Sequence, residues 1–440
     1  MKKVLITTLG CKVNQYESAA FKAGFEDAGL TVVARNGQAD IVVINTCAVT
    51  GSAGAQSRQA IHKALRKNPG AEIIICGCYA EIAASELAAD EELQGRAYTL
   101  IGNSKKDQLV DEALAGSSAA PKILLGNIAE ALEICRLPVR RFGDRVRAYL
   151  RIQDGCESYC TYCIVPFTRG PSRSLPMAEV IAQAKVFANE GHKEIVLTGI
   201  HLGNYGRDLP EKPGLVALLD ELTRTTPDVA YRISSLEPLE IDATLLGLMA
   251  ERKNIQPHLH IPLQSGHDQI LARMGRRYST EQFRQVINLC KKYLPDAAIG
   301  IDILVGFPGE TDDHFAAAKD FLQSLDCTYL HVFPYSIRPG TKAAGFDGHV
   351  AKKVKEQRVA ILRQLSDTKK AAFWQSQLGR IWPVLIEGRR DANGMLKGFT
   401  TNYVAVTFPG PDDLLHKVVP VKLLELLESS VLGEIAHHEN

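Results

Sequence analysis

The sequence predicts an α/β protein built from three parts: an N-terminal doubly wound parallel sheet, a central partial (β/α)6 barrel and a small C-terminal antiparallel β-barrel. Unbroken apolar runs alternate with helical stretches near the start of the chain. Six further strand and helix units follow from about residue 146, and short alternating segments fill the region after residue 379. At 440 residues the chain is about three times as long as a typical domain, which agrees with this division.

The first part is predicted from short β-branched runs without polar alternation, at residues 4–6, 41–44 and 73–75. Such strands are typical of a parallel sheet covered on both faces, and the stretches between them, such as residues 16–28, have a helical pattern. The small residues of 116–121 then indicate a linker. We therefore expect a first domain at residues 1–118 and a linker at 119–141.

The central part is predicted from strand candidates with helical segments between them. These candidates are residues 149–152, 195–197, 231–233, 258–261, 299–305 and 330–333. The residues from Ser279 to Gln282 resemble a capping box at the start of one of the helices. A lysine-rich polar helix at 351–377 closes this part, which we expect to span residues 142–374.

The last part, residues 375–440, is predicted from four short alternating segments at residues 381–387, 395–400, 403–408 and 417–421. Several short strands in about sixty residues indicate a small β-barrel, an architecture that often binds nucleic acid. A plain structural cap is the alternative, because the basic residues here are outnumbered by acidic ones.

Composition excludes several classes of protein. With 45% hydrophobic and 23% charged residues, the chain is not mainly disordered or fibrous. A formal charge of +1 excludes a uniformly basic nucleic-acid coat, so RNA contacts must come from local patches. No apolar run suits a membrane span or a signal peptide, and we expect a cytoplasmic protein without membrane contact. Ten cysteines in such a chain serve metals or catalysis more often than disulfides.

The strongest motif is formed by Cys156, Cys160 and Cys163, directly after a predicted strand. Three thiolates in eight residues can bind one face of a compact metal centre. The next cysteine downstream is Cys290, so one iron of a 4Fe-4S cube would lack a protein thiolate and be free to bind a substrate. Structural zinc normally has four protein ligands, so the count of three favours an iron-sulfur site with chemistry at the metal.

A second triad consists of Cys11, Cys47 and Cys78, each just after one of the three apolar strands of the first part. Because the carboxyl ends of parallel strands share one edge, these residues should meet there. We predict a second metal site with an open position, the alternative being three buried cysteines. Cys76 is expected on the same side of its strand as Cys78, which is the better ligand candidate at the strand end.

Other metal-binding side chains have simpler explanations. Cys135, Cys290 and Cys327 are isolated among apolar or helical neighbours and are assigned to packing. His258 and His260 alternate on one predicted strand, where two histidines could hold zinc. No partner carboxylate stands out in the sequence, and histidines satisfied within the core are the favoured interpretation.

The cysteine motif of 156–163 matches the radical S-adenosylmethionine signature, and the whole chain resembles the methylthiotransferase family, with a terminal barrel similar to a TRAM domain. Further family motifs are TLGCKVNQYES (8–18), NTCAVT (45–50), GCYA (77–80), RISSLEP (232–238) and GFPGET (306–311). The LGCKVN version around Cys11 is most similar to the branch that acts on N6-threonylcarbamoyladenosine beside the anticodon of tRNA. The isopentenyladenosine branch tends towards GCQMN and the ribosomal-protein branch towards GCPKN.

This resemblance implies an activity and its cofactors. A 4Fe-4S cluster on Cys156, Cys160 and Cys163 would bind S-adenosylmethionine through its open iron, and one electron would split the sulfonium. The 5′-deoxyadenosyl radical would take hydrogen from adenine C2, with sulfur supplied through a second 4Fe-4S cluster on Cys11, Cys47 and Cys78. A second S-adenosylmethionine would supply the methyl group. The cluster ligands are the only residues to which we assign catalysis.

Candidate contacts to S-adenosylmethionine come from the ends of predicted strands and from the cysteine motif. A glycine at a strand end lets the backbone approach a ligand, and carboxylate, amide and hydroxyl groups can bond to its ribose or amino groups. An aromatic ring beside the cluster could shield it or stack on adenine. These candidates are Tyr162, Thr198, Gly199, Glu237, Gln264 and Ser265.

The expected partners are the tRNA anticodon stem-loop, a low-potential electron donor such as flavodoxin or ferredoxin, and a sulfur source. RNA contact is expected from the terminal barrel and from the basic helix at 351–377, with a further arginine cluster at 140–151. The alternatives are methylthiolation of isopentenyladenosine in tRNA or of a ribosomal protein, and a non-catalytic metal-stabilised RNA-binding module.

Overall fold

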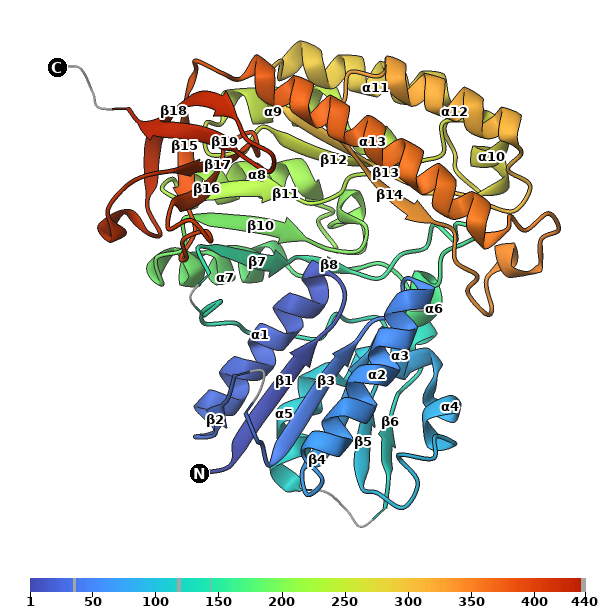
Figure 1. The fold of residues 1–440 in the computed structure, drawn as a ribbon. Coiled ribbons are helices and arrows are strands. Elements are labelled where there is room, and N and C mark those ends of the chain that lie inside the picture. Colours follow the sequence, from blue (N-terminus) through green and yellow to red (C-terminus); the bar gives the residue numbers. More distant parts are fainter. Residues whose placement is uncertain (35–36, 117–119, 144, 437–440) are drawn as a thin grey trace.

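The computed structural model describes residues 1–34, 37–116, 120–143 and 145–436, and its N-terminal part is a six-stranded parallel sheet (Figure 1). The strand order is β2-β1-β3-β4-β5-β6. The strands are β1 (Lys3–Thr8), β2 (Thr31–Val32), β3 (Ile41–Thr46), β4 (Glu72–Gly77), β5 (Tyr98–Ile101) and β6 (Lys122–Leu124). The helices are α1 (Lys12–Asp27), α2 (Gly51–Lys67), α3 (Cys78–Ile82), α4 (Ala84–Ala88) and α5 (Leu109–Ala115).

Both faces of this sheet are covered, as predicted from its unbroken apolar strands. In β3, Val43 packs in the core on the side of α1, whereas Val42 and Ile44 pack in a second core on the side of α2. The alternation of side chains along each strand therefore supplies two cores, and polar residues have no place between them. The sheet includes β6, which lies beyond the predicted domain end at 118. Residues 117–119, which contain that predicted end and the start of the linker, are outside the described residues.

The central part is an open barrel of six parallel strands. They form two sheets, β11-β10-β7 and β12-β13-β14, and Tyr231 of β11 also forms a parallel bridge with Ile255, which precedes β12. The strands are β7 (Arg147–Arg151), β10 (Glu194–Thr198), β11 (Ala230–Ile233), β12 (His258–Gln264), β13 (Ala298–Val305) and β14 (Tyr329–Pro334). Each coincides with one of the six predicted segments, so the partial barrel is confirmed.

Helices cover the outside of the barrel. They are α7 (Met177–Asn189), α8 (Gly214–Thr225), α9 (Ala243–Glu251), α10 (Asp268–Arg273), α11 (Thr280–Tyr293), α12 (Asp312–Ser324) and the long α13 (Lys352–Ser376). The predicted capping box starts α11, since the Ser279 hydroxyl accepts from the Gln282 amide and the Gln282 side chain accepts from the Ser279 amide. A short hairpin of β8 (Gln153–Asp154) and β9 (Arg173–Ser174) encloses α6 (Val165–Arg169).

The C-terminal part is a closed five-stranded barrel in the order β15-β16-β17-β19-β18. Its strands are β15 (Ile381–Ile386), β16 (Leu396–Thr400), β17 (Ala405–Phe408), β18 (Val418–Leu426) and β19 (Val431–Ile435). The sequence did not predict β19, and its pairing with β17 is parallel, whereas the other four pairings are antiparallel. This barrel packs at the amino ends of the central strands, where the Tyr403 ring lies 4.6 Å from that of His258. The last four residues of the predicted domain are outside the described residues.

None of the helices in the described ranges combines the length and the apolar character needed to cross a bilayer.

Candidate functional site

Three cysteines far apart in the sequence meet at one edge of the N-terminal sheet. Cys11 follows β1, Cys47 follows β3 and Cys78 follows β4. The loop before Cys11 passes so close to Cys47 that a Cβ on Gly10 would lie 2.6 Å from the Cys47 Sγ. Burial raises the pKa of Cys47 to about 11, and the neighbouring thiols of Cys78 and Cys11 add to the rise. The three thiols are therefore close enough to influence one another's ionisation.

Cys76 packs on a different side from Cys78, so our expectation that the two share one strand side is wrong. Cys76 belongs to the core on the side of α1, and Cys78 belongs to the core on the side of α2. Gly77 between them has a φ of +96°, and a Cβ on it would lie 2.4 Å from the carbonyl oxygen of Thr46. This left-handed residue ends the strand alternation, so that Cys78 begins α3.

A buried arginine that the sequence did not single out lies beside this triad. Arg169 of α6 is fully buried, and its guanidinium donates to the side chains of Asp154 (2.9 Å), Glu17 (3.1 Å) and Asn14 (2.7 Å). Burial raises the pKa of Cys11, and the positive charge of Arg169 opposes that rise. Because metal ligands must be thiolates, a fixed cation here favours the ligand form. The available signal was the pair of polar residues, Asn14 and Glu17, on the buried face of α1.

The loop between β8 and α6 carries the second triad, Cys156, Cys160 and Cys163. Gly155 before the loop has a φ of +76°, and a Cβ there would lie 1.9 Å from the carbonyl oxygen of Pro171. The loop conformation therefore requires a glycine.

Three polar groups support the thiols of this loop. Burial opposes ionisation of Cys156, but hydrogen bonds with His201 (3.5 Å) and Ser158 (3.4 Å) lower its pKa overall. Burial likewise opposes the charge on His201, and its contacts with Cys156 and Glu240 raise the pKa of the ring to about 10. Arg276 donates to the Cys160 sulfur at 3.3 Å.

The spacing of the thiols distinguishes a single ion from a larger centre. Around one tetrahedral zinc, with Zn–S bonds of about 2.3 Å, the sulfur atoms would lie about 3.8 Å apart. Among the described residues, the group whose ligand atoms all lie within 4.8 Å of one another is His260, Asp302 and His331, and neither cysteine triad is so compact. The triads therefore fit a centre with several metal atoms better than one ion.

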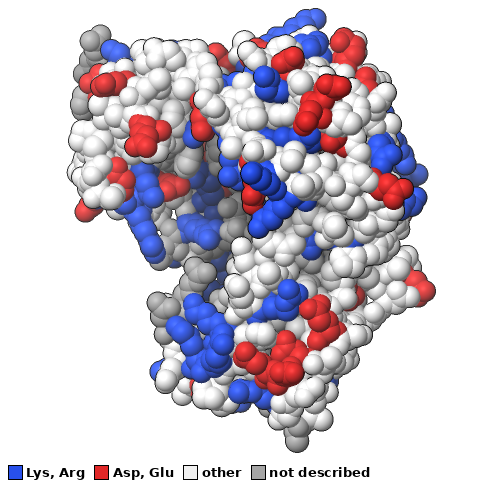
Figure 2. All heavy atoms as spheres, turned by 45° about the vertical axis from the view of Figure 1, so that its right-hand side comes forward, with Lys and Arg blue, Asp and Glu red and all other residues white. Residues whose placement is uncertain are grey.

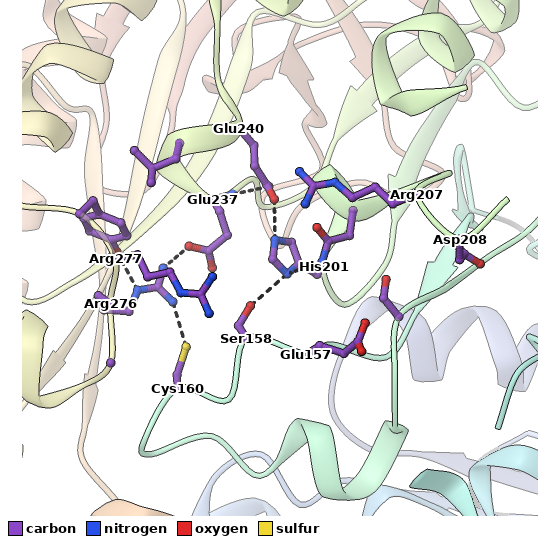
Figure 3. A pocket seen from close by; sticks show the side chains of 15 residues that line it. Glu157, Ser158, Cys160, His201, Arg207, Asp208, Glu237, Glu240, Arg276 and Arg277 are labelled. Carbon is purple, nitrogen blue, oxygen red and sulfur yellow. Dashed lines mark hydrogen bonds and ion pairs between the residues drawn. The ribbon is translucent and has the colours of Figure 1, made fainter. Parts of the chain in front are cut away.

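A cavity of about 610 Å³ opens beside Cys160 (Figure 3). Its wall carries charges of both signs, with His201 bonded to Glu240 at 2.5 Å and Arg276 paired with Glu237. The other charged groups of the wall are Glu157, Arg207, Asp208 and Arg277. A volume in this range and a mixture of cations and carboxylates suit a zwitterionic ligand of moderate size.

The structure divides the six predicted cofactor contacts between different places. Glu237 lines this cavity. Tyr162 and Gln264 line a second cavity of about 280 Å³. The remaining three, Thr198, Gly199 and Ser265, lie at strand ends. Thr198 and Ser265 are buried, and a Cβ on Gly199 would lie 2.9 Å from the Gln153 side chain.

The second cavity lies between the two cysteine triads. Val49 and Thr50, just after Cys47, form one side, and Cys163 forms part of the other. Arg338 also lines it, buried and without a carboxylate within 4.0 Å among the described residues. Segments that are distant in the sequence thus bring Cys163 and the residues just after Cys47 to one cavity.

The two predicted strand histidines behave differently. His258 is buried and bonds to the Tyr329 hydroxyl at 2.7 Å, as expected for a histidine satisfied in the core. The Nε2 of His260 lies 2.8 Å from a carboxylate oxygen of Asp302, and His331 lies 3.7 Å from the same oxygen. Asp302 was not identified from the sequence as a partner carboxylate, although it is a charged residue inside the apolar run of β13.

Several residues of the expected RNA surface are buried ion-pair partners instead. Arg358 of α13 is 4% exposed and pairs with Glu310 at 2.5 Å, and Arg151 is 1% exposed beside Glu17. Their charges are compensated inside the protein, so they cannot attract phosphate.

A more accessible basic region surrounds a cavity of about 930 Å³ where the N-terminal part, the barrel and the terminal barrel meet. Its cationic lining residues are Lys22, Arg141, Arg145, Arg147, Arg389 and Lys397, against the carboxylates of Glu190 and Glu387. Lys and Arg side chains are also gathered around a deep hollow of the surface in Figure 2.

Family models match all three parts of the chain. Residues 3–95 match the Uncharacterized protein family UPF0004, residues 150–322 match the Radical SAM superfamily, and residues 375–436 match the TRAM domain.

Similar proteins span almost the whole chain. The threonylcarbamoyladenosine tRNA methylthiotransferase MtaB of Bacillus subtilis is 39% identical over 97% of this chain and 94% of its own length. The protein of the same name from Aquifex aeolicus is 36% identical over 93% and 97%. A tRNA-2-methylthio-N(6)-dimethylallyladenosine synthase of Fusobacterium nucleatum is 34% identical over 99% and 100%.

Among solved structures, the radical S-adenosylmethionine methyltransferase TsrM from Kitasatospora setae has a similar fold, with a TM-score of 0.56. The match covers 78% of this chain and 77% of TsrM at 15% identity, and it bears on the fold alone.

Proposed function

This chain belongs to the radical S-adenosylmethionine methylthiotransferase family, and we propose that it converts N6-threonylcarbamoyladenosine beside the anticodon of tRNA to its 2-methylthio derivative. The observation that carries the proposal is the cavity with Val49 and Thr50 on one side and Cys163 on the other, because it joins the surroundings of both triads. The names of the Bacillus and Aquifex relatives support the choice of nucleoside.

Two 4Fe-4S clusters fit the donors present. Cys156, Cys160 and Cys163 would hold one, and Cys11, Cys47 and Cys78 the other. Each set offers three thiols for four irons, is wider than a single ion requires, and has a cation within reach. When bound, the clusters and two molecules of S-adenosylmethionine would supply the radical, the sulfur and the methyl group that replace hydrogen on adenine C2.

The residues of the chain position these groups. His201 and Ser158 hold Cys156, and Arg276 holds Cys160. In the mixed-charge cavity, Glu237 would accept from the amino group of S-adenosylmethionine and the nearby arginines would bind its carboxylate. The other proposed contacts are Tyr162, Thr198, Gly199, Gln264 and Ser265.

The RNA would enter from the side where the terminal barrel and the basic cavity lie together. A low-potential one-electron donor such as flavodoxin or ferredoxin, and a separate sulfur source, complete the proposed reaction. Domain boundaries at 118, 141 and 374 remain part of this proposal, and the family matches to residues 3–95, 150–322 and 375–436 are compatible with them.

Nucleoside mass spectrometry tests the proposed substrate. In a strain in which this gene is disrupted, we expect 2-methylthio-N6-threonylcarbamoyladenosine to disappear from tRNA and its unmodified precursor to accumulate. Restoring the gene should restore the product. Loss of the methylthio derivative of isopentenyladenosine instead, or unchanged tRNA, would contradict the proposal.

Iron analysis tests the two sites separately. Anaerobically reconstituted protein should hold about eight irons per chain, and each single variant, Cys11→Ala or Cys156→Ala, should hold about half as many. We expect C156A to lose reductant-dependent cleavage of S-adenosylmethionine and C11A to retain that cleavage without forming product. Cys290→Ala serves as the control, because Cys290 is buried in the core far from both motifs in sequence. Zinc in place of iron would contradict the proposal.

A further inference from the structure

One lysine beside the N-terminal triad has no role in the functions described so far. Lys12 is the first residue of α1, directly after Cys11. Its side chain leaves the N-terminal part and reaches the central barrel, where the ammonium lies 3.4 Å from the hydroxyl of Ser234, just after β11. The residue as a whole is exposed to solvent, and its ammonium lies in a part-buried position between the two parts.

Like Arg338 in the second cavity, Lys12 has no counterion in contact, and of these two cations it is the one that directly follows a cysteine of the N-terminal triad. Among the described ranges of the chain, no carboxylate lies within 4.0 Å of its ammonium. Lys106, by contrast, pairs with Glu17. Three other cations nearby also have carboxylate partners. These pairs are Arg169 with Asp154, Arg232 with Glu194 and Arg276 with Glu237. An ammonium held in place but left unpaired can bind an incoming anion without first breaking an ion pair.

The wall near Lys12 is polar. The charge of Arg232 opposes that of Lys12, the carboxylates of Asp302 on β13 and Glu194 favour it, and Lys12 in turn acts on His331 of β14. The Nε2 of His260 already lies 2.8 Å from the Asp302 carboxylate, and the neighbouring His331 is about half exposed. The group formed by Lys12, Asp302, His260 and His331, here called the polar wall, is therefore available to a ligand that carries both an anion and hydrogen-bond donors.

We propose that Lys12 binds the carboxylate of the threonyl group of the substrate nucleoside, and that the polar wall binds the adjoining urea and hydroxyl groups. The inference rests on the proposed function and adds the residue that would select the nucleoside. C2 and N6 of adenine border the same edge of the base, so a substituent on N6 extends past the carbon that receives sulfur. Lys12, which directly follows Cys11, is thus placed to contact this N6 substituent.

This assignment predicts specificity by charge. Threonylcarbamoyladenosine carries a carboxylate and isopentenyladenosine carries a hydrocarbon in the same position. A hydrogen-bonded ion pair with Lys12 would favour the first, and the second would leave the ammonium without a partner. Removing such a contact typically changes an equilibrium or a rate about 10-fold to 100-fold.

Two synthetic anticodon stem-loops test the proposal. One contains threonylcarbamoyladenosine, and the other contains the same nucleoside with its carboxylate converted to a methylamide. The reconstituted wild-type enzyme should show kcat/KM at least about 10-fold higher for the free carboxylate. Lys12→Gln should bring this ratio close to one, Lys12→Arg should preserve much of it, and Lys63→Gln on the exposed face of α2 should leave it unchanged.

Each enzyme is compared with itself on two RNAs, so the ratio does not depend on the fraction of protein that is correctly loaded. Iron content measured in parallel shows whether K12Q still assembles both centres. A wild-type enzyme without preference, or a K12Q enzyme that keeps the preference, would overturn the role of Lys12 while leaving the proposed function intact. A wild-type enzyme that modifies neither RNA would overturn the proposed function itself.

Discussion

Glu17 shows how the charge of one residue can stabilise the region around a candidate metal centre. It lies in α1 with 1% of its side chain exposed, and it contacts Lys106 (2.5 Å) and Arg169 (3.1 Å). Lys106 comes from the N-terminal part and Arg169 from the loop region of the barrel, so the carboxylate connects the two parts. A buried carboxylate with several cationic partners is costly to disturb, because removing one partner leaves an uncompensated charge.

The pKa of Glu17 sets a pH range for this stabilisation. Burial acts to raise the pKa, but Lys106, Arg169 and Arg151 outweigh it and hold the value at about 2, against an ordinary 4.5. Since the folded value is the lower one, the stabilisation is complete above about pH 4.5 and is lost as the pH falls towards 2. For Glu17→Gln we expect a loss of about 3 kcal/mol of unfolding free energy at neutral pH and a weaker dependence on pH in this range.

Chemical denaturation of the metal-free protein as a function of pH measures both effects. Glu26→Gln is the matched control on the same helix, because Glu26 is half exposed and forms only a surface pair with Lys22. We expect this control to follow the wild type. If the wild type and E17Q lose stability in parallel between pH 4.5 and pH 2, Glu17 is not the group responsible.

The residues of the candidate site could be predicted from the sequence where they lie close together in the chain at a characteristic spacing. Cys156, Cys160 and Cys163 are close in the chain, and their grouping follows from the loop they share. The environment of Cys11 could be predicted only in part, because Arg169 approaches it from another part of the chain. No local pattern connects residues 158 positions apart. Long-range polar contacts of this kind require the tertiary fold.

At the level of single elements, the turn at Gly77 decides where Cys78 lies. Gly77 has a positive φ and no room for a side chain, with the Thr46 carbonyl oxygen 2.4 Å from the position of a Cβ. Gly77→Ala should therefore displace the start of α3 and the Cys78 thiol with it. We expect the reconstituted variant to retain the cluster on the Cys156 loop and to bind only about half the iron of the wild type.

Iron analysis and absorption spectra of the purified variant provide the measurement. Gly29→Ala is the control, since Gly29 also has a positive φ, of +79°, but nothing lies within 4 Å of its missing Cβ. Gly29→Ala therefore also places a side chain on a residue with positive φ, but its Cβ would not collide with another atom. Full iron content in G77A would show that the turn does not determine the position of Cys78.

Strands were predictable where they are long and buried on both faces, as with β3 and β4. The strands that were missed lack that signal. β6 has three residues, two of them exposed, and β19 contains Gly433 within its five residues. Pairing with a neighbouring strand, rather than local composition, stabilises such segments. The same limit explains why the faces of Cys76 and Cys78 were assigned wrongly: one glycine interrupts the alternation.

For the whole molecule, the sequence predicted the three-part architecture but not how the parts meet. The terminal barrel sits at the amino ends of the central strands, and contacts between aromatic and basic groups, such as Arg232 over the Tyr403 ring at 4.7 Å, hold it there. The basic cavity arises only from this arrangement, because its lining residues come from α1, β7 and the segment before it, the turn after α7, and the terminal barrel. The arginine cluster at 140–151 indicated part of it from the sequence, but the near-neutral total charge and the acidic composition of the terminal barrel did not reveal the cations from α1 and the terminal barrel.

This arrangement leads to a prediction about tRNA binding. Arg141 and Arg389 both line the basic cavity, are exposed, and have no carboxylate within 4.0 Å among the described residues. If each neutralises one phosphate, the logarithm of tRNA affinity should fall less steeply with the logarithm of salt concentration in Arg141→Gln and in Arg389→Gln. The slope should decrease by about 0.7–0.9 for each variant, and by about twice as much in the double variant, because fewer counterions are released. Binding assays at several salt concentrations measure the slopes, with Lys63→Gln on the exposed face of α2 as the matched control.

Because Arg141 and Arg389 belong to different parts of the chain, additive effects would mean that one RNA spans both parts. Wild-type slopes in both single variants would mean that the phosphates are bound elsewhere.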